Sequence, residues 1–509
     1  MLRRFWLSFA ILAVSVALCD SSSADQRPNV LFISVDDLND WVSLFGGHPQ
    51  ARTPNIDRLA SRGAVVFQNA HCPGPVCGPS RSALLSGFMP HRSGVYTNSQ
   101  NMLRSSLVQA HATLPEYFAK HGYLTISRGK IFHAHATENG LDRGQWAFER
   151  WEQGRGSAKV DPAKVTSRSK NMINGQPGPP TNMTKRSGSE FAWGPTIGGI
   201  EDTGDFQTAK WAAKELAMEH DRPFFMAVGF SKPHLPFFAP QEFFDMYPLS
   251  DLKSNPILED DLDDILKPDG QLKFAQTTDF SWVQENDLFD EATQAYLACV
   301  SFADACVGEV LDALESSPYA DNTIVVLWGD HGWHLGEKLR YRKATGWFES
   351  TRLPLVIRTP NMNQRQDCPR PVNLIDLYPT LIEYCGLPAK PEIDGTSLLP
   401  LLEDPTREWA QATVTIVRWA SAAVHSERWH YILHVDGTRE LYDADIDKLE
   451  WNNLANSPTA EQKEAMVQMS KFLPKKYARE IPKSDPTWKT SAKGLDRTLK
   501  AKRNLSELQ

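Results

Sequence analysis

Val30-Leu31-Phe32-Ile33-Ser34-Val35-Asp36-Asp37 is an almost unbroken apolar run closed by two carboxylates. A short, continuous apolar run of this kind is typical of a parallel strand that is buried on both faces. Similar runs are found at 123–127, 224–230, 324–328 and 353–357, and helical patterns at 55–62, 114–121, 205–220 and 291–315 separate them. Alternating strands and helices predict an α/β fold, in which helices sandwich a large mixed sheet that is mostly parallel.

Charged and imidazole side chains stand where the predicted strands end. They are Asp36 and Asp37 after the first strand, Lys130 and His133 after the second, His234 after the third, Asp330 and His331 after the fourth, and Lys343 in the loop before the fifth. Open α/β sheets bind their ligands beyond the carboxyl ends of the strands. We therefore expect these side chains to meet at one rim of the sheet.

The run Cys77-Gly78-Pro79-Ser80-Arg81 is a second informative motif. Pro79 suits the first position of a helix, because its missing N–H would be unpaired there, and residues 82–85 continue with good or neutral helix formers. Cys77 would then lie just before the first turn, where free N–H groups favour an anion, and Arg81 could add a fork of donors. The motif indicates a nucleophile beside an anion site; a structural cysteine at a helix start is the alternative.

The strand-end groups also indicate a cation. Three carboxylates around one point, those of Asp36, Asp37 and Asp330, cannot all stay ionised without a positive charge. Oxygen-rich ligation suits calcium or magnesium better than zinc. A divalent ion together with the nearby lysines would match a sulfate or phosphate ester. Taken singly, each lysine or histidine could equally be a solvated or hydrogen-bonded surface group.

Composition and the N-terminus restrict the class of protein. A net charge of −8 over 509 residues argues against a nucleic-acid-binding protein. Arg3 and Arg4, an apolar run at 5–18 and small residues at 22–24 predict a signal peptide over 1–24. That run is too short to span a bilayer, so we expect no stable membrane insertion. The predicted location is periplasmic or secreted, or lysosomal in a eukaryote; Leu18 disfavours a lipoprotein anchor at Cys19.

The remaining chain divides into two predicted domains. A catalytic domain is expected over 25–402, with a Gly- and Pro-rich insertion at 154–199 that we interpret as a loop over the rim. A small α+β subdomain is expected over 403–509. It contains antiparallel strands at 413–419, 422–425, 429–434 and 440–442, a helix at 459–473 and a loose basic tail. Cys368 and Cys385 are the favoured pair if a disulfide forms.

The motifs resemble those of type I sulfatases, within the alkaline phosphatase-like superfamily. Residues 77–81 match the sulfatase signature C-x-P-S-R, which is followed by a helix and Gly87; Ser86 stands where threonine is commoner. Within the family the chain is most similar to the iduronate-2-sulfatase group. The strings that carry this likeness are 30–37, 129–133, 224–237, 329–337 and 440–443.

The resemblance implies a reaction and a set of roles. Cys77 would be converted to formylglycine (3-oxoalanine) by a formylglycine-generating maturation enzyme, and its hydrate would attack the sulfate sulfur. One calcium ion would be held by Asp36, Asp37, Cys77, Asp330 and His331. Arg81 would orient the hydrate, while Lys130, Lys343 and His234 would contact the sulfate. His234 or Lys343 would protonate the leaving oxygen, and His133 is the candidate base that releases sulfate.

The resemblance implies a sulfated saccharide as substrate, either iduronate sulfate in a glycosaminoglycan or another sulfated polysaccharide. Trp193, Lys185-Arg186 and residues 340–342 are candidate sugar or polyanion contacts, or plain surface. Two alternatives stay open at this point. One is a phosphodiester or phosphonate monoester hydrolase of the same superfamily, and the other is a binder of sulfated glycans that performs no chemistry.

Overall fold

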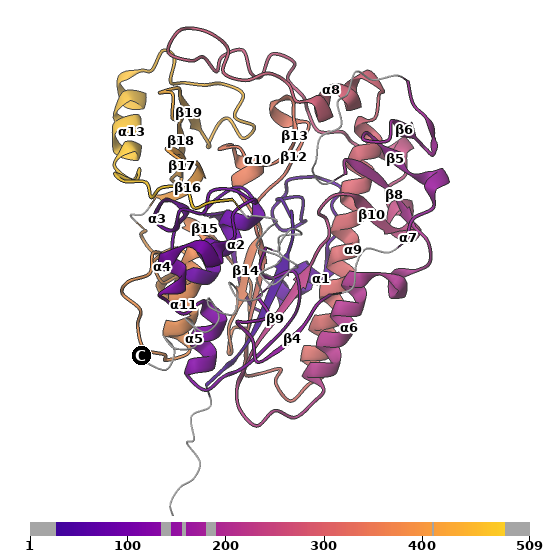
Figure 1. Cartoon of the computed structure of the whole chain (residues 1–509), viewed down its shortest axis with the longest axis vertical. Helices are drawn as coiled ribbons and strands as arrows, with labels where there is room; N and C mark the ends of the chain where they lie inside the picture. Colours follow the sequence, from indigo (N-terminus) through magenta and orange to yellow (C-terminus); the bar gives the residue numbers. More distant parts are fainter. Residues whose placement is uncertain (1–26, 134–143, 155–158, 180–189, 410–411, 484–509) are drawn as a thin grey trace, which may run out of the picture.

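The fold centres on an eight-stranded sheet (Figure 1). The computed structural model describes residues 27–133, 144–154, 159–179, 190–409 and 412–483. Across the sheet the order is β15-β2-β14-β11-β1-β9-β3-β4. The strands are β1 (Asn29–Val35), β2 (Val65–His71), β3 (Leu124–Gly129), β4 (Arg150–Glu152), β9 (Phe224–Phe230), β11 (Thr323–Gly329), β14 (Leu355–Arg358) and β15 (Gln366–Asn373).

Most neighbouring strands of this sheet run parallel, as the sequence predicts. β1 lies between β11 and β9 and is parallel to both, and β3 continues the parallel block. β14 is the exception, because it is antiparallel to β11 and to β2. The start of β14 therefore lies on the same rim as the carboxyl ends of β1, β9 and β11. This direction explains how the loop before β14 reaches the groups that follow the parallel strands.

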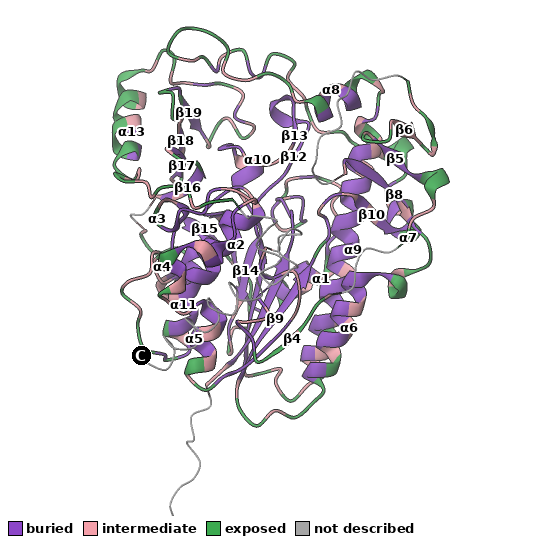
Figure 2. Cartoon of the chain, in the orientation of Figure 1, coloured by how far each residue is buried: buried purple, intermediate pink, exposed green. Residues whose placement is uncertain are grey.

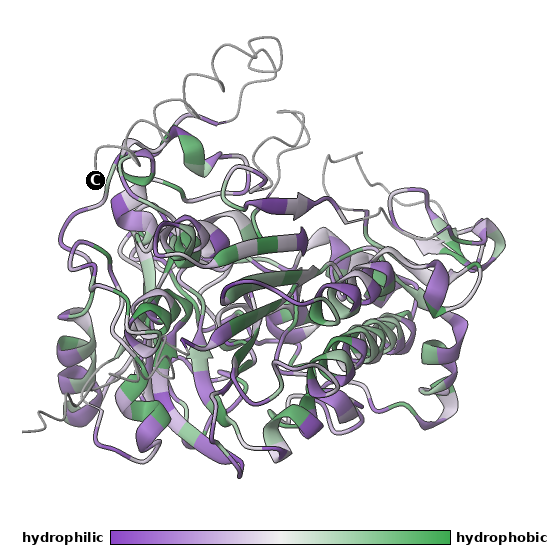
Figure 3. Ribbon diagram, turned by 90° about the horizontal axis from the view of Figure 1, so that it is seen from below, coloured by the Kyte–Doolittle hydropathy of each residue, from purple (hydrophilic) through white to green (hydrophobic). Residues whose placement is uncertain are grey.

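Successive side chains of β1 pack alternately into two hydrophobic cores. Leu31, Ile33 and Val35 point into one core and Val30 and Phe32 into the other. The first core is covered by α1 (Pro54–Ser61), α6 (Gly204–Leu216) and α9 (Phe289–Glu315), and the second by α2 (Cys77–Ser86), α5 (Leu114–Lys120) and α11 (Leu377–Tyr384). Figures 1 and 2 show these helices on opposite faces of buried strands. Figure 3 shows that the strands between the helices are largely apolar.

The insertion at 154–199 is not the open loop that the sequence suggested. Its described residues supply four of the five strands of a second sheet, whose order is β10-β8-β5-β6-β7. The strands are β5 (Thr166–Ser167), β6 (Met172–Ile173), β7 (Gln176–Pro177), β8 (Ala192–Thr196) and β10 (Phe237–Pro240). The sheet is anchored because β8 is buried against the first core. Shorter helices include α3 (Pro90–Ser93), α4 (Ser106–Gln109), α7 (Gln241–Asp245), α8 (Thr278–Glu285), α10 (Phe348–Thr351) and α12 (Leu399–Glu403).

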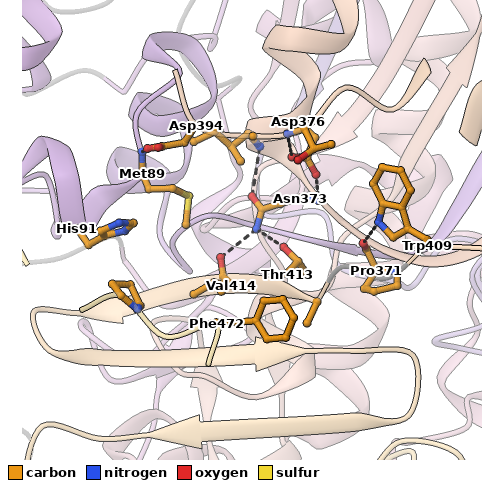
Figure 4. Close-up of a pocket in the computed structure, with 15 residues that line it drawn as sticks. Met89, His91, Pro371, Asn373, Asp376, Asp394, Trp409, Thr413, Val414 and Phe472 are labelled. Carbon is orange, nitrogen blue, oxygen red and sulfur yellow. Dashed lines mark hydrogen bonds between the residues drawn. The ribbon is translucent and has the colours of Figure 1, made fainter. Parts of the chain in front are cut away.

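A four-stranded antiparallel sheet and one helix form the C-terminal part. The elements are β16 (Thr413–Arg418), β17 (Ser421–His425), β18 (Trp429–Leu433), β19 (Arg439–Asp443) and α13 (Ala460–Ser470). The Asn373 side-chain amide, at the end of β15, donates to Thr413 Oγ1 at 2.9 Å and to the Val414 carbonyl at 3.1 Å. Figure 4 shows these bonds beside a pocket that also includes Trp409 and Phe472. The small sheet is thus tied directly to the large one, while the boundary at residue 402 stays a prediction.

Three further groups of expectations concern the cysteines, segments outside the described residues, and membrane insertion. Cys368 and Cys385 are both free and buried, so the disulfide favoured from the sequence is not formed. The signal peptide predicted over 1–24, the tail after residue 483 and the Lys185-Arg186 contact lie outside the described residues. In the part of the chain that the structure describes, no helix combines the length and apolarity needed to cross a bilayer.

Candidate active site

The rim brings Asp36, Asp37, Asp330 and His331 together. Val35 pairs with Gly329 in the β1–β11 ladder, so the residues that follow the two strands leave the sheet side by side. All four side chains are buried. His331 Nδ1 lies 2.9 Å from the Gly332 carbonyl. Because a carbonyl can only accept, Nδ1 carries the proton and Nε2 directs its lone pair towards the carboxylates.

Cys77 is the first residue of α2 rather than the residue before it. Val76, with φ −153° and ψ 151°, precedes the helix, and Pro79 is therefore its third residue. A proline is tolerated there because the N–H groups of the first turn have no partner within the helix. The Gly78 N–H donates to Asn98 Oδ1 at 2.7 Å, which fixes the start of the helix. Cys77 Sγ consequently lies 3.3 Å from His331 Nε2 and 3.8 Å from Asp37 Oδ1.

Arg81 is fully buried and binds the carboxylates themselves. Its Nε donates to Asp330 Oδ2 at 2.7 Å, and a terminal nitrogen donates to Asp36 Oδ1 at 3.1 Å. The other terminal nitrogen donates to Ser34 Oγ at 2.9 Å and to the Lys130 carbonyl at 2.7 Å. A planar fork suits this bidentate task, which a lysine could not perform. The sequence suggested an anion-binding fork; the structure places its donors on protein oxygens.

Two lysines lie close to the Cys77 sulfur. Lys130 forms an ion pair with Asp36, and its Nζ lies 3.7 Å from Sγ. Lys343 forms an ion pair with Asp37, and its Nζ lies 3.1 Å from Sγ. Although burial works against its charged form, Lys343 has a raised pKa because of the Asp37 carboxylate. Both lysines therefore bring positive charge to the sulfur.

Lys130 reaches the site because β3 approaches β9 closely at Gly129. Gly129 has φ +87°, and a Cβ atom there would collide with the Gly229 carbonyl. Only glycine therefore fits between Arg128 and Lys130. The two residues after Lys130 are buried, and His133, which follows them, is half-buried. His133 thus lies two residues beyond Ile131, whose carbonyl accepts a hydrogen bond from Arg81 at 3.0 Å.

His234 lies on the loop after β9, at the side of Asp37. Its Nε2 is 3.8 Å from Asp37 Oδ2, and its Nδ1 donates to the Leu235 carbonyl at 2.6 Å. Burial, together with the charge of Lys130, lowers the pKa of His234 to about 3. The imidazole is therefore neutral at pH 7, with Nε2 facing the carboxylates.

The loop that carries His234 is held by residues that the sequence analysis did not select. Asp205 Oδ2 accepts the N–H groups of Ser231 at 2.9 Å and Lys232 at 2.8 Å. Lys232 Nζ donates to the carbonyls of His234 at 2.8 Å and Pro236 at 2.5 Å. In the sequence, Asp205 could be recognised only as an acidic residue in the first turn of a helix. Such residues are common at helix starts and do not by themselves indicate a functional site.

Tyr296 and Ser34 are further contacts that sequence reasoning missed. The Tyr296 hydroxyl donates to the Asp37 carbonyl at 2.7 Å and accepts the Asn39 N–H at 3.0 Å. Asp37 has φ +60°, a conformation that is uncommon for aspartate, and Tyr296 fixes it from α9. Ser34 was visible as the one polar residue within the apolar run of β1. Nothing in the α9 sequence distinguishes Tyr296 from an ordinary core tyrosine.

The buried charges shift the pKa values in opposite directions. Burial raises the pKa of the Asp37 carboxyl, although Lys343 opposes this effect. Burial would also raise the pKa of the Asp36 carboxyl, yet its ion pair with Lys130 holds that pKa well below its usual range. Burial, reinforced by the charge of Asp36, raises the pKa of the Cys77 thiol to about 12. The thiol is therefore protonated at neutral pH and is a poor nucleophile as it stands.

The carboxylate groups fit a divalent cation. One candidate ligand set is Asp36, Cys77, Asp330 and His331, whose ligand atoms all lie within 4.8 Å of one another. A second set with the same spread contains Asp36, Asp37, Cys77 and His234. Asp37 Oδ2 is buried and accepts no hydrogen bond from any residue in the described ranges. A buried carboxylate oxygen without a donor is costly, and a hard cation such as calcium would satisfy it.

The predicted sugar contacts differ in how far they are buried. Trp193 is 3% exposed and its indole N–H donates to Glu291 at 3.4 Å, so it belongs to the core. Arg340 is also buried, with its guanidinium 4.6 Å from the centre of the Trp347 ring. Arg342 keeps a side-chain exposure of 30% and is the accessible one among the predicted contacts that the structure describes.

Comparisons with known proteins find sulfatases among the relatives of this chain. A family model described as Sulfatase matches residues 28–387, and one described as N-sulphoglucosamine sulphohydrolase, C-terminal, matches residues 329–477. A Formosa agariphila protein named Sulfatase is 36% identical over 496 residues, which cover 94% of this chain and 92% of that one. Iduronate 2-sulfatase of Mus musculus is 30% identical over 430 residues, which cover 76% and 74%.

Solved structures share the architecture. BT4656, solved in complex with its substrate D-glucosamine-2-N,6-O-disulfate, has a TM-score of 0.66 at 21% identity, covering 88% of this chain and 97% of that one. Phosphonate monoester hydrolase of Agrobacterium radiobacter has a TM-score of 0.68 at 22% identity, covering 87% and 94%. These likenesses confirm the predicted alkaline phosphatase-like fold, and the sequence matches confirm the resemblance on which it was based. Because the family match runs from β1 to α11 and the Formosa relative matches along nearly its whole length, this chain belongs to the sulfatase family.

Proposed function

We propose that this chain removes sulfate from a sulfated saccharide, and that a modified Cys77 provides the nucleophile. The observation that carries the proposal is the position of the Cys77 sulfur, which lies within 3.1 Å of Lys343 Nζ and 3.7 Å of Lys130 Nζ. Cationic groups fixed around a nucleophile stabilise the charge that develops on an ester during its transition state. Sulfate ester hydrolysis is also the chemistry of the family.

Conversion of Cys77 to formylglycine by a maturation enzyme is part of the proposal. The hydrated aldehyde would supply one hydroxyl group to attack sulfur and a second whose deprotonation releases sulfate. The buried, protonated state of the unmodified thiol supports this conversion, because such a thiol has little nucleophilicity of its own. Arg81 would act by fixing Asp36 and Asp330, and through them the shape of the site.

One calcium ion would be held by Asp36, Asp37, Asp330, His331 and the modified Cys77. It would supply positive charge to a sulfate oxygen. Lys130 and Lys343 would bind the remaining sulfate oxygens. His234 or Lys343 would protonate the leaving oxygen. His234 would bind the sulfate through Nε2, and His133 is the proposed base for sulfate release.

The saccharide class rests on the relatives. One of them is named iduronate 2-sulfatase, and BT4656 was solved with a disulfated glucosamine as its substrate. We therefore propose iduronate sulfate in a glycosaminoglycan as the first substrate to test, with other sulfated polysaccharides as its competitors. The N-terminal pattern of Arg3, Arg4 and the apolar run 5–18 supports export of the protein.

Two measurements on the purified protein test the proposal. Mass spectrometry of the peptide that contains Cys77 should show the mass decrease that accompanies conversion of a thiol to an aldehyde. Release of inorganic sulfate from 4-nitrophenyl sulfate should exceed hydrolysis of a 4-nitrophenyl phosphonate ester, and Cys77→Ala should abolish it. Faster hydrolysis of the phosphonate ester would mean that the preferred substrate is a phosphonate and not a sulfate ester. An unmodified thiol, with glycan binding but no sulfate release, would refute it.

A further inference from the structure

Three buried histidines stack where the C-terminal sheet meets the large sheet. The ring of His425, the last residue of β17, packs against those of His71, the last residue of β2, and His430 in β18. The ring centres are 3.7 Å apart for His71 and His425 and 4.2 Å apart for His425 and His430. Phe348 of α10, which Figure 1 shows beside β17 and β18, lies with its ring centre 4.6 Å from that of His430. All three histidines are fully buried, so this histidine stack belongs to the contact between the two sheets.

The hydrogen bonds of His71 suit a neutral imidazole. Its Nε2 lies 2.8 Å from Asn69 Oδ1, and the Asn69 side-chain amide donates to the Ser426 carbonyl at 3.2 Å. Because Asn69 Oδ1 can only accept, His71 carries its proton on Nε2, and its Nδ1 accepts the Thr351 hydroxyl at 3.3 Å. Both ring nitrogens are thus used by the neutral form. A second ring proton would displace the Thr351 hydroxyl from its role as donor.

His425 has no acceptor for a ring proton. Neither of its ring nitrogens makes a hydrogen bond within the part of the chain that the structure describes, and neither does His430 Nε2. His430 Nδ1, in contrast, forms an ion pair with Glu450. A neutral His425 already leaves one buried N–H unpaired, whereas an imidazolium would leave two, together with a charge withdrawn from water. The histidine stack is therefore built around an uncharged His425.

The charges near the histidine stack also oppose a proton on His71 or His425. Glu450 offers its charge to His430, but among the described residues no carboxylate lies within ion-pair distance of the other two rings. Burial, reinforced by the charges of His430 and Arg352, lowers the pKa of His71 well below its usual range. Burial, reinforced by the other two imidazoles, also lowers the pKa of His425 well below its usual range. The titratable and charged groups beside the stack are Glu349 and Arg352 in and after α10, Tyr442 of β19, and Glu450.

The histidine stack adjoins the chain that leads to Cys77. The Thr415 hydroxyl donates at 2.6 Å to the carbonyl of Cys72, which lies in the segment between His71 and Cys77. β16, which carries Thr415, pairs along its length with β17, which carries His425. Separation of His425 from His71 would thus pull β16 away from the segment that leads to Cys77.

We propose that the histidine stack is an acid-sensitive contact, which holds the C-terminal sheet against the segment leading to Cys77 at neutral pH and loosens when His425 takes up a proton. The stacked, buried ring offers no place for a second N–H, so the protonated form favours separated rings in contact with water. A histidine side chain in water has a pKa of about 6.5. Because the closed contact holds His425 neutral, its stabilising effect is complete above that pH and is lost as the pH falls below it.

Hydrogen exchange of the full-length protein, followed by mass spectrometry at pH 7.5 and pH 5.5, tests the contact. The measured rates are first corrected for the effect of pH on the exchange of unstructured peptide. Uptake of one proton on opening raises the opening equilibrium about tenfold for each pH unit below the pKa of the exposed ring. We therefore expect protection in 413–433 and 66–76 to fall about tenfold between the two pH values, or about 100-fold if His71 also takes up a proton. Protection in 224–230, the central strand β9, should stay unchanged.

Two variants assign the effect to His425. His425→Phe keeps a flat ring in the histidine stack but cannot take up a proton, so the acid effect on 413–433 should shrink about tenfold. His220→Phe is the matched control, because His220 also stacks on an aromatic ring, that of Tyr319 at 5.7 Å, but lies outside the histidine stack. It should show the same acid effect as the wild type.

Three results would overturn the inference. The first is equal protection of 413–433 at the two pH values in the wild type, a result that does not depend on any variant folding. The second is an equal acid effect in the wild type and His425→Phe. The third is a loss of protection that extends equally to 224–230, since that would indicate acid unfolding of the whole protein rather than the opening of one contact.

Discussion

The backbone N–H of Asp37 donates to Asp330 Oδ1 at 3.0 Å, although 293 residues separate the two in the sequence. The β1–β11 ladder places both residues just beyond the rim, and the hydrogen bond fixes one carboxylate relative to the other. The geometry of the carboxylate group therefore depends on the register of two central strands rather than on a flexible loop. Substitutions at this rim should affect the stability of the sheet as well as activity.

Arg81→Ala should destabilise the fold as well as remove turnover. Arg81 is fully buried between Asp36 and Asp330, and loss of one partner of a buried ion pair costs about 3–5 kcal/mol. Chemical denaturation of the variant should show this loss in the free energy of unfolding. Arg92→Ala is the control, because Arg92 pairs with Asp394 at 39% exposure and should cost about 1 kcal/mol or less. Equal losses in the two variants would contradict the structural role of Arg81.

Lys343→Ala should reduce turnover in a protein that still folds, although loss of the ion pair with Asp37 should lower its stability. The variant loses a positive charge 3.1 Å from the Cys77 sulfur, and proton transfer by a positioned group is worth about 10²–10⁴-fold. Steady-state kinetics with 4-nitrophenyl sulfate and far-UV circular dichroism would test both parts. Lys210→Ala, which removes an ion pair between α6 and Glu309 of α9, should behave as the wild type. Near-normal turnover in Lys343→Ala would contradict the role given to this lysine.

Removal of divalent cations should lower both activity and thermal stability. A ligand that binds only the folded state stabilises it by about 2.7 kcal/mol at a concentration 100 times its Kd. Melting curves recorded with EGTA and with added calcium should therefore differ, and calcium should restore activity. The calcium-dependent shift should shrink in Asp37→Asn, which removes the carboxylate whose Oδ2 lacks a donor among the described residues. Identical melting curves with and without calcium would argue against a bound cation.

Asp205→Ala should impair turnover although Asp205 does not contact the sulfur. Its Oδ2 holds the N–H groups of Ser231 and Lys232, which fix the loop before His234. Leaving these N–H groups without an acceptor costs about 1–3 kcal/mol each. We expect a lower free energy of unfolding together with a lower kcat, and partial recovery in Asp205→Asn, since an amide oxygen still accepts. A loss of stability without any change in kcat would limit Asp205 to a structural role.

The central sheet and most of the site could be predicted from the sequence. The buried parallel strands are apolar on both faces, so β1, β9 and β11 stand out within one or two residues of their observed ends. The charged residues at these ends follow from the rule for ligand sites in open sheets. The roles assigned to the individual residues remain predictions.

The edge of the sheet and the supporting contacts could not be predicted in this way. β15 contains Pro369 and Pro371 and shifts register between Cys368 and Pro371, features that a strand tolerates only at an edge. Its polar, proline-rich sequence therefore does not look like a strand. The insertion sheet is built from strands of two to five residues, too short for a periodic signal. Contacts such as Tyr296 with Asp37 depend on tertiary packing and have no local signature.

The hydrogen bonds that bring β16 against the segment before α2 have a consequence for biosynthesis. The Thr415 hydroxyl donates to the Cys72 carbonyl at 2.6 Å, and the Ile416 N–H donates to the Pro73 carbonyl at 2.9 Å. During translation, more than 300 residues must emerge from the ribosome after Cys72 before these bonds can form. The nascent segment that contains Cys77 would stay accessible during that interval, and completion of the chain would then close it off from any modifying enzyme.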